Sequence, residues 1–153
     1  MEYMKNFDEA EKIDKLRNKM LKYILYKKRT ELEVRQKFSQ EDEKEVDDAI
    51  EYFKELHYID DFDYVDRSIQ EFINLKNLSI KEICYKLYQK GVNKKIVDSY
   101  ICNHKEKLIE YEVNSAQNIW NKKIINLEPE EIKQFLYKKG YMDETIQVIS
   151  NFE

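Results

Sequence analysis

Apolar residues recur along this chain at steps of three and four positions, which is the spacing of one face of an α-helix. Polar residues fill the positions between them, so each stripe predicts a helix that is half exposed to water. The stripes are Ile13, Leu16, Met20 and Ile24; Val46, Ile50, Phe53 and Leu56; Phe62, Val65, Ile69 and Phe72; Val97, Tyr100 and Ile101; Val113, Ala116, Trp120 and Ile124; and Ile146, Ile149 and Phe152. The pattern therefore predicts an all-α protein.

Shorter helices are predicted between these stripes by signals for a helix start. Thr30 is followed three residues later by Glu33, and Ser79 is followed in the same way by Glu82. Both pairs fit a capping box, in which the hydroxyl accepts from a free backbone N–H and the carboxylate reaches back to the cap residue.

A third short helix is expected after Glu128, because Pro129 suits the first turn of a helix, where its missing N–H has no partner to lose. Gly91 and Gly140 lie where the second and third short helices should end. Glycine commonly ends a helix in the left-handed conformation, so both residues are expected to adopt it.

The three helix starts are each 49 residues apart, and this offset exposes an internal repeat. Other positions agree: Glu33 with Glu82 and Glu131, Val34 with Ile83 and Ile132, Phe38 with Leu87 and Leu136, and Gly91 with Gly140. Units of this size bury their apolar faces by stacking, so we expect an elongated, curved array of three tandem three-helix repeats. The expected boundaries are a lead-in over 1–13 and repeats over 14–59, 60–107 and 108–153.

The amino-acid composition agrees with an all-helical fold and limits the classes of function that the chain can have. Hydrophobic residues make up 42% and charged residues 38%, while the chain has two glycines and one proline. So few turn residues exclude a protein of many short strands. The net charge is −4, whereas a free-standing DNA-binding domain is usually basic.

Candidate chemistry is sparse. Cys84 and Cys102 are isolated thiols without metal-ligand spacing, and His57 and His104 lie far apart near expected helix ends. The charged opening over 1–12 does not fit a signal peptide, and no apolar stretch has the length to cross a membrane. We therefore expect a cytoplasmic protein that is not an enzyme, with no cofactor and no metal site.

Several segments of the chain match motifs that occur together in one protein family. The strongest is Tyr58–Val65, where an Asp pair is followed by an aromatic helix start, as at the family's joint between first and second repeats. Gln89–Val92 and Phe135–Tyr141 are similar to the family's Lys-Gly and Arg-Gly helix ends. Ala116 and the pair Lys122–Lys123 lie where the family has an Ala-rich helix that ends in two lysines. Together these segments resemble the RecX family of bacterial regulatory proteins, and the resemblance extends from about Leu16 to Phe152.

This resemblance implies nine helices in three repeats that dock in the helical groove of a RecA filament on DNA. Members of the family restrain filament growth and lower the ATPase, strand-exchange and coprotease activities of RecA. The implied role is therefore regulation of DNA recombination, DNA repair and the SOS response. The expected partner is the RecA filament, with DNA reached through the filament and the chain itself a monomer.

Basic side chains on the short helices and near them are the expected contacts, because equivalent helices of a stacked array tend to line one face. A strip of positive charge would suit an acidic groove of a filament or the backbone of its DNA. The tyrosines Tyr85 and Tyr88 are also expected to face a partner. The candidate contacts are Arg35, Lys37, Arg67, Lys76, Lys81, Lys86, Lys90, Lys94, Lys133, Lys138 and Lys139.

Two alternatives remain open. The segment Arg67–Leu78 carries one Arg and one Lys where many RecX proteins have a richly basic helix, and Asn77 stands near the family's glycine. This departure favours a helical-repeat module with a different protein partner. A weak direct DNA binder is the second alternative, and it would lose affinity steeply with salt.

Overall fold

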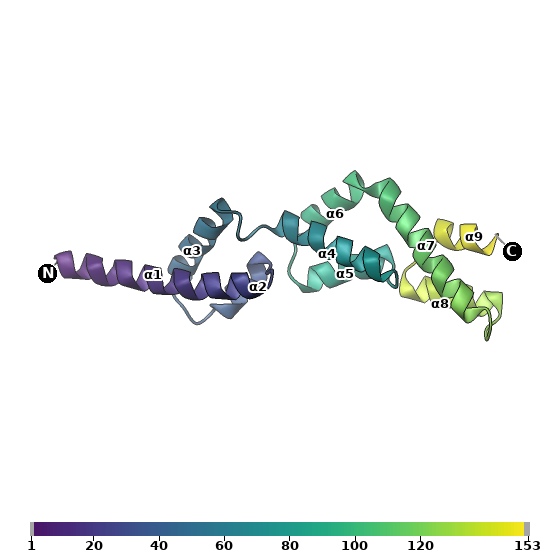
Figure 1. The fold of residues 1–153 in the computed structure, drawn as a ribbon, viewed down its shortest axis with the longest axis horizontal. Coiled ribbons are helices and arrows are strands. Elements are labelled where there is room, and N and C mark those ends of the chain that lie inside the picture. Colours follow the sequence, from purple (N-terminus) through teal and green to yellow (C-terminus); the bar gives the residue numbers. More distant parts are fainter. Residues whose placement is uncertain (1, 152–153) are drawn as a thin grey trace. The chain divides into compact units, whose positions relative to one another are not determined.

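A computed structural model describes residues 2–151 of the chain, so Phe152 of the last predicted stripe lies outside the described residues. Within that range the secondary structure consists of nine α-helices and no β-strand, which confirms the all-α prediction (Figure 1). The helices are α1 (Glu2–Tyr26), α2 (Glu31–Lys37), α3 (Glu43–Glu55), α4 (Asp61–Leu75), α5 (Ile80–Gln89), α6 (Lys94–Asn103), α7 (Lys105–Lys123), α8 (Pro129–Lys139) and α9 (Asp143–Ser150).

Contacts divide the described chain into two compact units. Unit 1 runs to Tyr64 and also includes Lys90–Val92, whereas unit 2 contains Val65–Gln89 and the chain from Asn93 onward. The short segment 90–92 follows α5 in sequence but belongs to unit 1 by its contacts. The repeat boundaries expected from the sequence stay a prediction.

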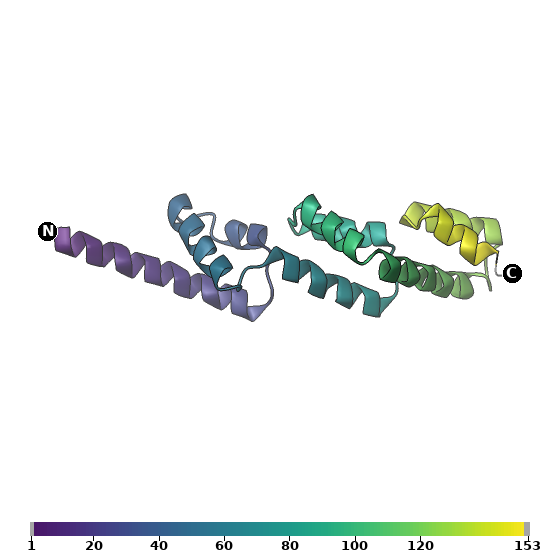
Figure 2. The same ribbon diagram turned by 90° about the horizontal axis from the view of Figure 1, so that it is seen from above.

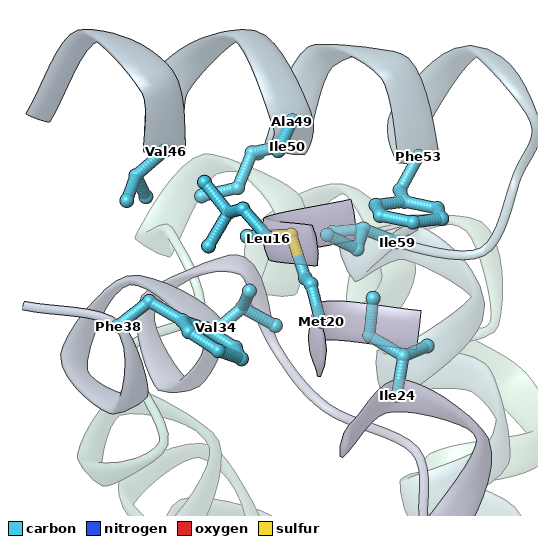
Figure 3. Close-up of a cluster of buried hydrophobic side chains, with 10 residues drawn as sticks. All are labelled: Leu16, Met20, Ile24, Val34, Phe38, Val46, Ala49, Ile50, Phe53 and Ile59. Atoms are coloured by element: carbon cyan, nitrogen blue, oxygen red, sulfur yellow. The ribbon is translucent and has the colours of Figure 1, made fainter. Parts of the chain in front are cut away.

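The core of unit 1 lies among α1, α2 and α3, and Figure 3 shows its side chains pointing toward one another. Met20 of α1, Val34 of α2 and Ile50 of α3 are fully buried at its centre. Burial of a side chain of this size stabilises a fold by about 1.5–3 kcal/mol. The remaining members are Leu16, Ile24, Phe38, Val46, Ala49, Phe53 and Ile59.

In unit 2, α7 packs against both α8 and α9, which lie alongside it in Figure 2. Trp120 of α7 is 3% exposed, as its place on an apolar stripe predicted. It packs in one cluster with Ile132 and Leu136 of α8 and with Ile146 and Ile149 of α9.

Both predicted capping boxes are present. The hydroxyl of Thr30 accepts from the amide of Glu33 at 3.1 Å, and that of Ser79 accepts from the amide of Glu82 at 3.1 Å. Each hydroxyl also donates to a carbonyl 60 residues later: Thr30 to Lys90 at 2.6 Å, and Ser79 to Lys139 at 2.8 Å. Each cap residue therefore bonds a carbonyl that is distant in sequence but lies within its own compact unit.

Gly91 and Gly140 directly follow Lys90 and Lys139, whose carbonyls accept these hydrogen bonds. Both glycines adopt the left-handed conformation as predicted, with φ of 88° at Gly91 and 98° at Gly140. A Cβ on Gly91 would lie 2.3 Å from Cδ2 of Leu32, and one on Gly140 would lie 3.1 Å from Cβ of Lys81. Leu32 and Lys81 are themselves 49 residues apart, so the same close approach recurs in both units. Glycine is required here by conformation and by space.

Four residues of the predicted apolar stripes are exposed in the structure. They are Ile13, Leu56, Phe62 and Ile124, with exposed fractions between 37% and 63%. Leu56 and Ile124 are the C-cap residues of α3 and α7, Phe62 lies in the first turn of α4, and Ile13 precedes the first core residue of α1. Each stripe thus extends beyond the part of its helix that neighbouring helices cover.

The start of α4 is tied to α2. The carboxylate of Asp60 accepts from the amide of Asp63 at 3.2 Å and so caps α4, as the predicted joint requires. The carboxylate of Asp61 instead accepts from the amide of Glu31, the first residue of α2, at 3.0 Å. Burial raises the pKa of Asp61, while this backbone hydrogen bond acts against the rise.

A buried carboxyl group connects three helices of unit 2. Glu112 of α7 is 0% exposed. Its oxygens accept from the amide of Ile80 at 3.2 Å, from the hydroxyl of Thr145 at 2.8 Å and from the amide of Met142 at 3.4 Å. Glu112 therefore serves the first turns of both α5 and α9, where backbone amides lack helical partners.

A second polar group of α7 holds the loop before α5. The hydroxyl of Ser115 lies 3.1 Å from the carbonyl of Lys76 and 2.7 Å from the hydroxyl of Tyr141, and the hydroxyl of Tyr111 donates to Leu78 at 2.7 Å. Burial raises the pKa of both Tyr111 and Tyr141. These bonds give the carbonyls of Lys76 and Leu78, which lie outside the helices, hydrogen-bond partners on α7.

Candidate protein-binding surface

Of the three candidate contacts in unit 1, the charged groups of two lie near other side chains of the chain, and that of the third does not. Arg35 of α2 forms an ion pair with Asp47 of α3. The ammonium group of Lys37 lies 5.6 Å from the centre of the Tyr23 ring, near the limit of a cation–π interaction. Lys90 is exposed, and its carbonyl is the acceptor of the Thr30 hydroxyl. Arg35 therefore has a structural partner, whereas the side chain of Lys90 faces water.

On and near α4 and α5 the candidates lie mostly in water. Arg67 is exposed, and Lys76 follows the last residue of α4 in the left-handed conformation, with φ of 54°. Lys81 packs its methylene groups near Gly140. Within residues 2–151, Lys86 and Lys94 are exposed and form no ion pair.

The tyrosines on α5 are accessible, as expected for side chains that contact a partner. Tyr85 is 62% exposed and Tyr88 is 38% exposed. Exposed tyrosines are common in interfaces because they supply a large apolar area with a polar end. Their role in binding stays a prediction.

The three candidates on α8 differ from one another. Lys133 pairs with Glu130 at 3.2 Å on the surface, an interaction of little energetic weight. Lys139 is only 23% exposed and contacts both carboxylate oxygens of Glu82 on α5, at 2.8 and 2.9 Å. Lys138 is exposed and forms no ion pair with any described residue. Lys139 therefore belongs to the packing of α8 against the start of α5.

A surface groove of about 600 Å³ lies beside this ion pair. Its walls come from the end of α7, from α8 and from the loop before α5, and we call it the α7–α8 groove. The lining comprises Asn77, Leu78, Ile119, Lys122, Lys123, Asn126, Leu127, Phe135 and Lys139. No acidic residue is among these nine, so the groove is positively charged in a chain whose net charge is −4.

Two lysines of this groove, Lys122 and Lys123, are absent from the contacts expected from the sequence. The ammonium group of Lys123 lies 4.0 Å from the centre of the Phe135 ring. The Lys pair itself was a visible signal, since it matches the two lysines that end the corresponding helix in the RecX family. What the sequence did not reveal is that Phe135, thirteen positions after Lys122, lies beside this pair.

The two histidines occupy helix ends in different ways. The ring of His104 stacks on Tyr100, with centres 4.0 Å apart, and its Nδ1 lies 2.9 Å from the Tyr100 carbonyl. The hydroxyl of Tyr100 donates to Asp66 at 2.9 Å, and burial followed by this hydrogen bond raises the pKa of Tyr100 to about 12. His57 follows the C-cap of α3 with φ of 62°, and only its backbone amide bonds a carbonyl, that of Lys54.

Metal-binding clusters and membrane-spanning helices are both absent from residues 2–151. Among them, no three His, Cys, Asp or Glu side chains cluster closely enough to hold a metal ion. No described helix combines the length and apolar character that a membrane span requires.

The fold is that of an all-helical protein made of three tandem three-helix repeats. No protein-family model matches the chain. It is 34% identical to the regulatory protein RecX of Finegoldia magna over 145 residues, which cover 85% of this chain and 67% of the relative. It is 31% identical to the RecX of Clostridium beijerinckii over 160 residues, which cover 97% and 73%. The chain therefore belongs to the RecX family of regulatory proteins.

Solved structures agree with this assignment. The crystal structure of RecX from Lactobacillus salivarius matches with a TM-score of 0.79 and 26% identity over 93% of this chain and 96% of that one. A second crystal structure of a regulatory protein RecX matches with a TM-score of 0.80, and at 22% identity it supports the fold alone.

Proposed function

We propose that this chain binds the RecA filament and restrains its activity, without chemistry of its own. The observation that carries the proposal is the 34% identity with a regulatory protein RecX over 85% of the chain. The RecX resemblance implies RecA as the partner, DNA recombination and repair as the process, and a lowered ATPase as the result.

Repetition supports a filament as the partner. The same hydroxyl-to-carbonyl bond and the same glycine approach recur with a 49-residue offset, so similar surfaces recur along the chain. A filament also repeats its own surface at each subunit. Several modest contacts to adjacent subunits would add up to tight binding through avidity.

The candidate contacts are the basic side chains that remain exposed. Lys86, Lys94 and Lys138 have no ion-pair partner among the described residues, so they can meet an acidic surface without breaking an existing pair. Arg35 and Lys139 are weaker candidates, because each already holds a carboxylate of the chain.

Cosedimentation with RecA filaments on single-stranded DNA tests the proposal. Bare DNA and DNA-free RecA serve as controls. We expect the chain to pellet with filaments and to stay in the supernatant in both controls. Binding to bare DNA alone, with affinity that falls steeply with salt, would replace the proposal by direct DNA binding.

A different protein partner is the second candidate, and one observation favours it. The exposed side of α4 carries a single Arg before Lys76, where many RecX proteins are richly basic. Absence of cosedimentation at physiological salt, with a folded chain, would reject the RecA partner and leave this candidate.

A further inference from the structure

The α7–α8 groove combines an apolar floor with free positive charge. What we call the floor of the groove is the set of its apolar lining residues, which are Leu78, Ile119, Leu127 and Phe135. Phe135 is 37% exposed, so part of its ring is accessible from the groove. A concave surface of this kind, with a few polar groups at its edge, is typical of a binding site.

The charge of the groove is not neutralised by the chain. Of its three lysines, Lys139 is paired with Glu82, which leaves Lys122 and Lys123. Lys122 is exposed and has no ion pair among the described residues, and Lys123 is held over the ring of Phe135. The dipole of α7 favours lysines at its C-terminal end, but it does not account for the apolar floor beside them.

The positive charge and the apolar surface of the groove together indicate which class of ligand it binds. A nucleic acid would need an open aromatic face for its bases, but Lys123 lies over the ring of Phe135, and the other floor residues are aliphatic. The net charge of −4 also opposes a polyanion as long as DNA. A short peptide places its charge locally and can bury a side chain in the groove.

We propose that the α7–α8 groove binds an acidic segment of a protein partner. One large apolar side chain of the segment lies on the floor of the groove, and flanking carboxylates pair with Lys122 and Lys123. The amide side chains of Asn77 and Asn126, which also line the groove, supply hydrogen bonds to its backbone. The proposal deepens the proposed function, on which it rests for the presence of a protein partner.

A fluorescein-labelled peptide with one phenylalanine among glutamates is a suitable probe, and fluorescence anisotropy measures its affinity for the full chain. The double variant Lys122→Glu/Lys123→Glu should weaken binding about tenfold or more, because two surface ion pairs become repulsions. Phe135→Ala should weaken it roughly fivefold through lost apolar contact. The control Lys105→Glu/Lys107→Glu makes the same charge change at the other end of α7, where both lysines are exposed, and should bind as the unmodified chain does.

Two further probes make the result decisive. A peptide with alanine in place of phenylalanine should bind more weakly, and a labelled oligothymidine should bind more weakly than the acidic peptide. Equal binding of the acidic peptide by the control and the Lys122/Lys123 variant would overturn the proposal. Oligothymidine binding that is stronger and depends on the same lysines would also overturn it and assign the groove to nucleic acid.

Cosedimentation of the same variants separates this inference from the proposed function. If the unmodified chain and the Lys122/Lys123 variant pellet equally with RecA filaments, the groove is not the contact, and the proposed function stands. If the unmodified chain binds the peptide through the groove but does not pellet, the RecA partner is wrong and the acidic-segment site stands.

Discussion

Replacement of Glu112 should destabilise the fold more than any change of an exposed acid. Its carboxyl group is fully buried and accepts from three donors, at Ile80, Met142 and Thr145. Glu112→Ala leaves these donors without partners, and each unsatisfied buried donor costs about 1–3 kcal/mol. Because water can enter part of the space left by the side chain, we expect a loss of roughly 3–5 kcal/mol.

Glu112→Gln should cost less, and the structure indicates why. The amide oxygen can still accept from Ile80, and the amide NH₂ can donate to the Thr145 hydroxyl, which is able to reverse its role. The amide of Met142, already a long contact at 3.4 Å, loses its acceptor. The expected loss is therefore about 1–2 kcal/mol, close to that of one unsatisfied donor.

Urea unfolding measures both changes, with Trp120 as a built-in probe. It is the single tryptophan and lies buried in the unit that contains Glu112, so its fluorescence reports on this part of the fold. Glu110→Gln, an exposed acid on the same helix, is the matched control and should change stability by less than about 0.5 kcal/mol. A Glu112→Ala variant as stable as this control would refute the role of the buried carboxyl group.

Three other outcomes follow from the same structure. Gly140→Ala should lower stability by about 1–2 kcal/mol, because φ is 98° and the new Cβ would lie 3.1 Å from Lys81, and calorimetry would register a lower Tm. Cys102 is exposed, whereas burial and nearby Asp98 raise the pKa of the Cys84 thiol. A thiol reagent at neutral pH should therefore label Cys102 first, and equal labelling rates for the two cysteines would contradict this. The raised pKa of Tyr141 adds stability that is complete below about pH 10, the usual tyrosine value, and is lost at higher pH. Tyr141→Phe removes the hydroxyl that is hydrogen-bonded to Ser115, so urea unfolding should show lower stability at neutral pH, and without an ionisable ring its stability should fall less steeply above about pH 10.

The sequence was informative where a residue type acts locally. Thr30 and Ser79 cap their helices through neighbours three residues away, and Gly91 and Gly140 end helices through their own φ. Such features depend on the backbone near the residue, so one sequence with an internal repeat is enough to detect them. Together with the apolar stripes they predicted the helices and the repeat, whereas the family followed from segments such as Tyr58–Val65.

What the sequence could not reveal depends on distant contacts. The bond from Ser79 to the carbonyl of Lys139 and the ion pair of Lys139 with Glu82 join residues far apart in the chain. As a result Lys139 was expected at a partner surface but is largely committed to the fold. Phe135, by contrast, was not among the expected contacts, because it neighbours Lys123 only after α7 and α8 pack.

The buried hydrogen bonds of Glu112 were also not predicted from the sequence. Glu112 lies four residues before Ala116 and so falls on the apolar face of α7, unlike the exposed Glu110, but this spacing does not show which donors its carboxyl group meets. Its burial follows from the place of α7 among α5, α8 and α9, which supplies donors from two helix starts. No local pattern encodes such an arrangement.

The most direct test of the central claim, that this RecX-family chain restrains RecA, is the rate of ATP hydrolysis by RecA on circular single-stranded DNA. The chain is added in increasing amounts to filaments that are already formed. Binding along the filament predicts that the rate falls, and that the fall begins well below one chain per RecA subunit. An unchanged rate, at concentrations where the chain is folded and in excess over RecA, would contradict the account.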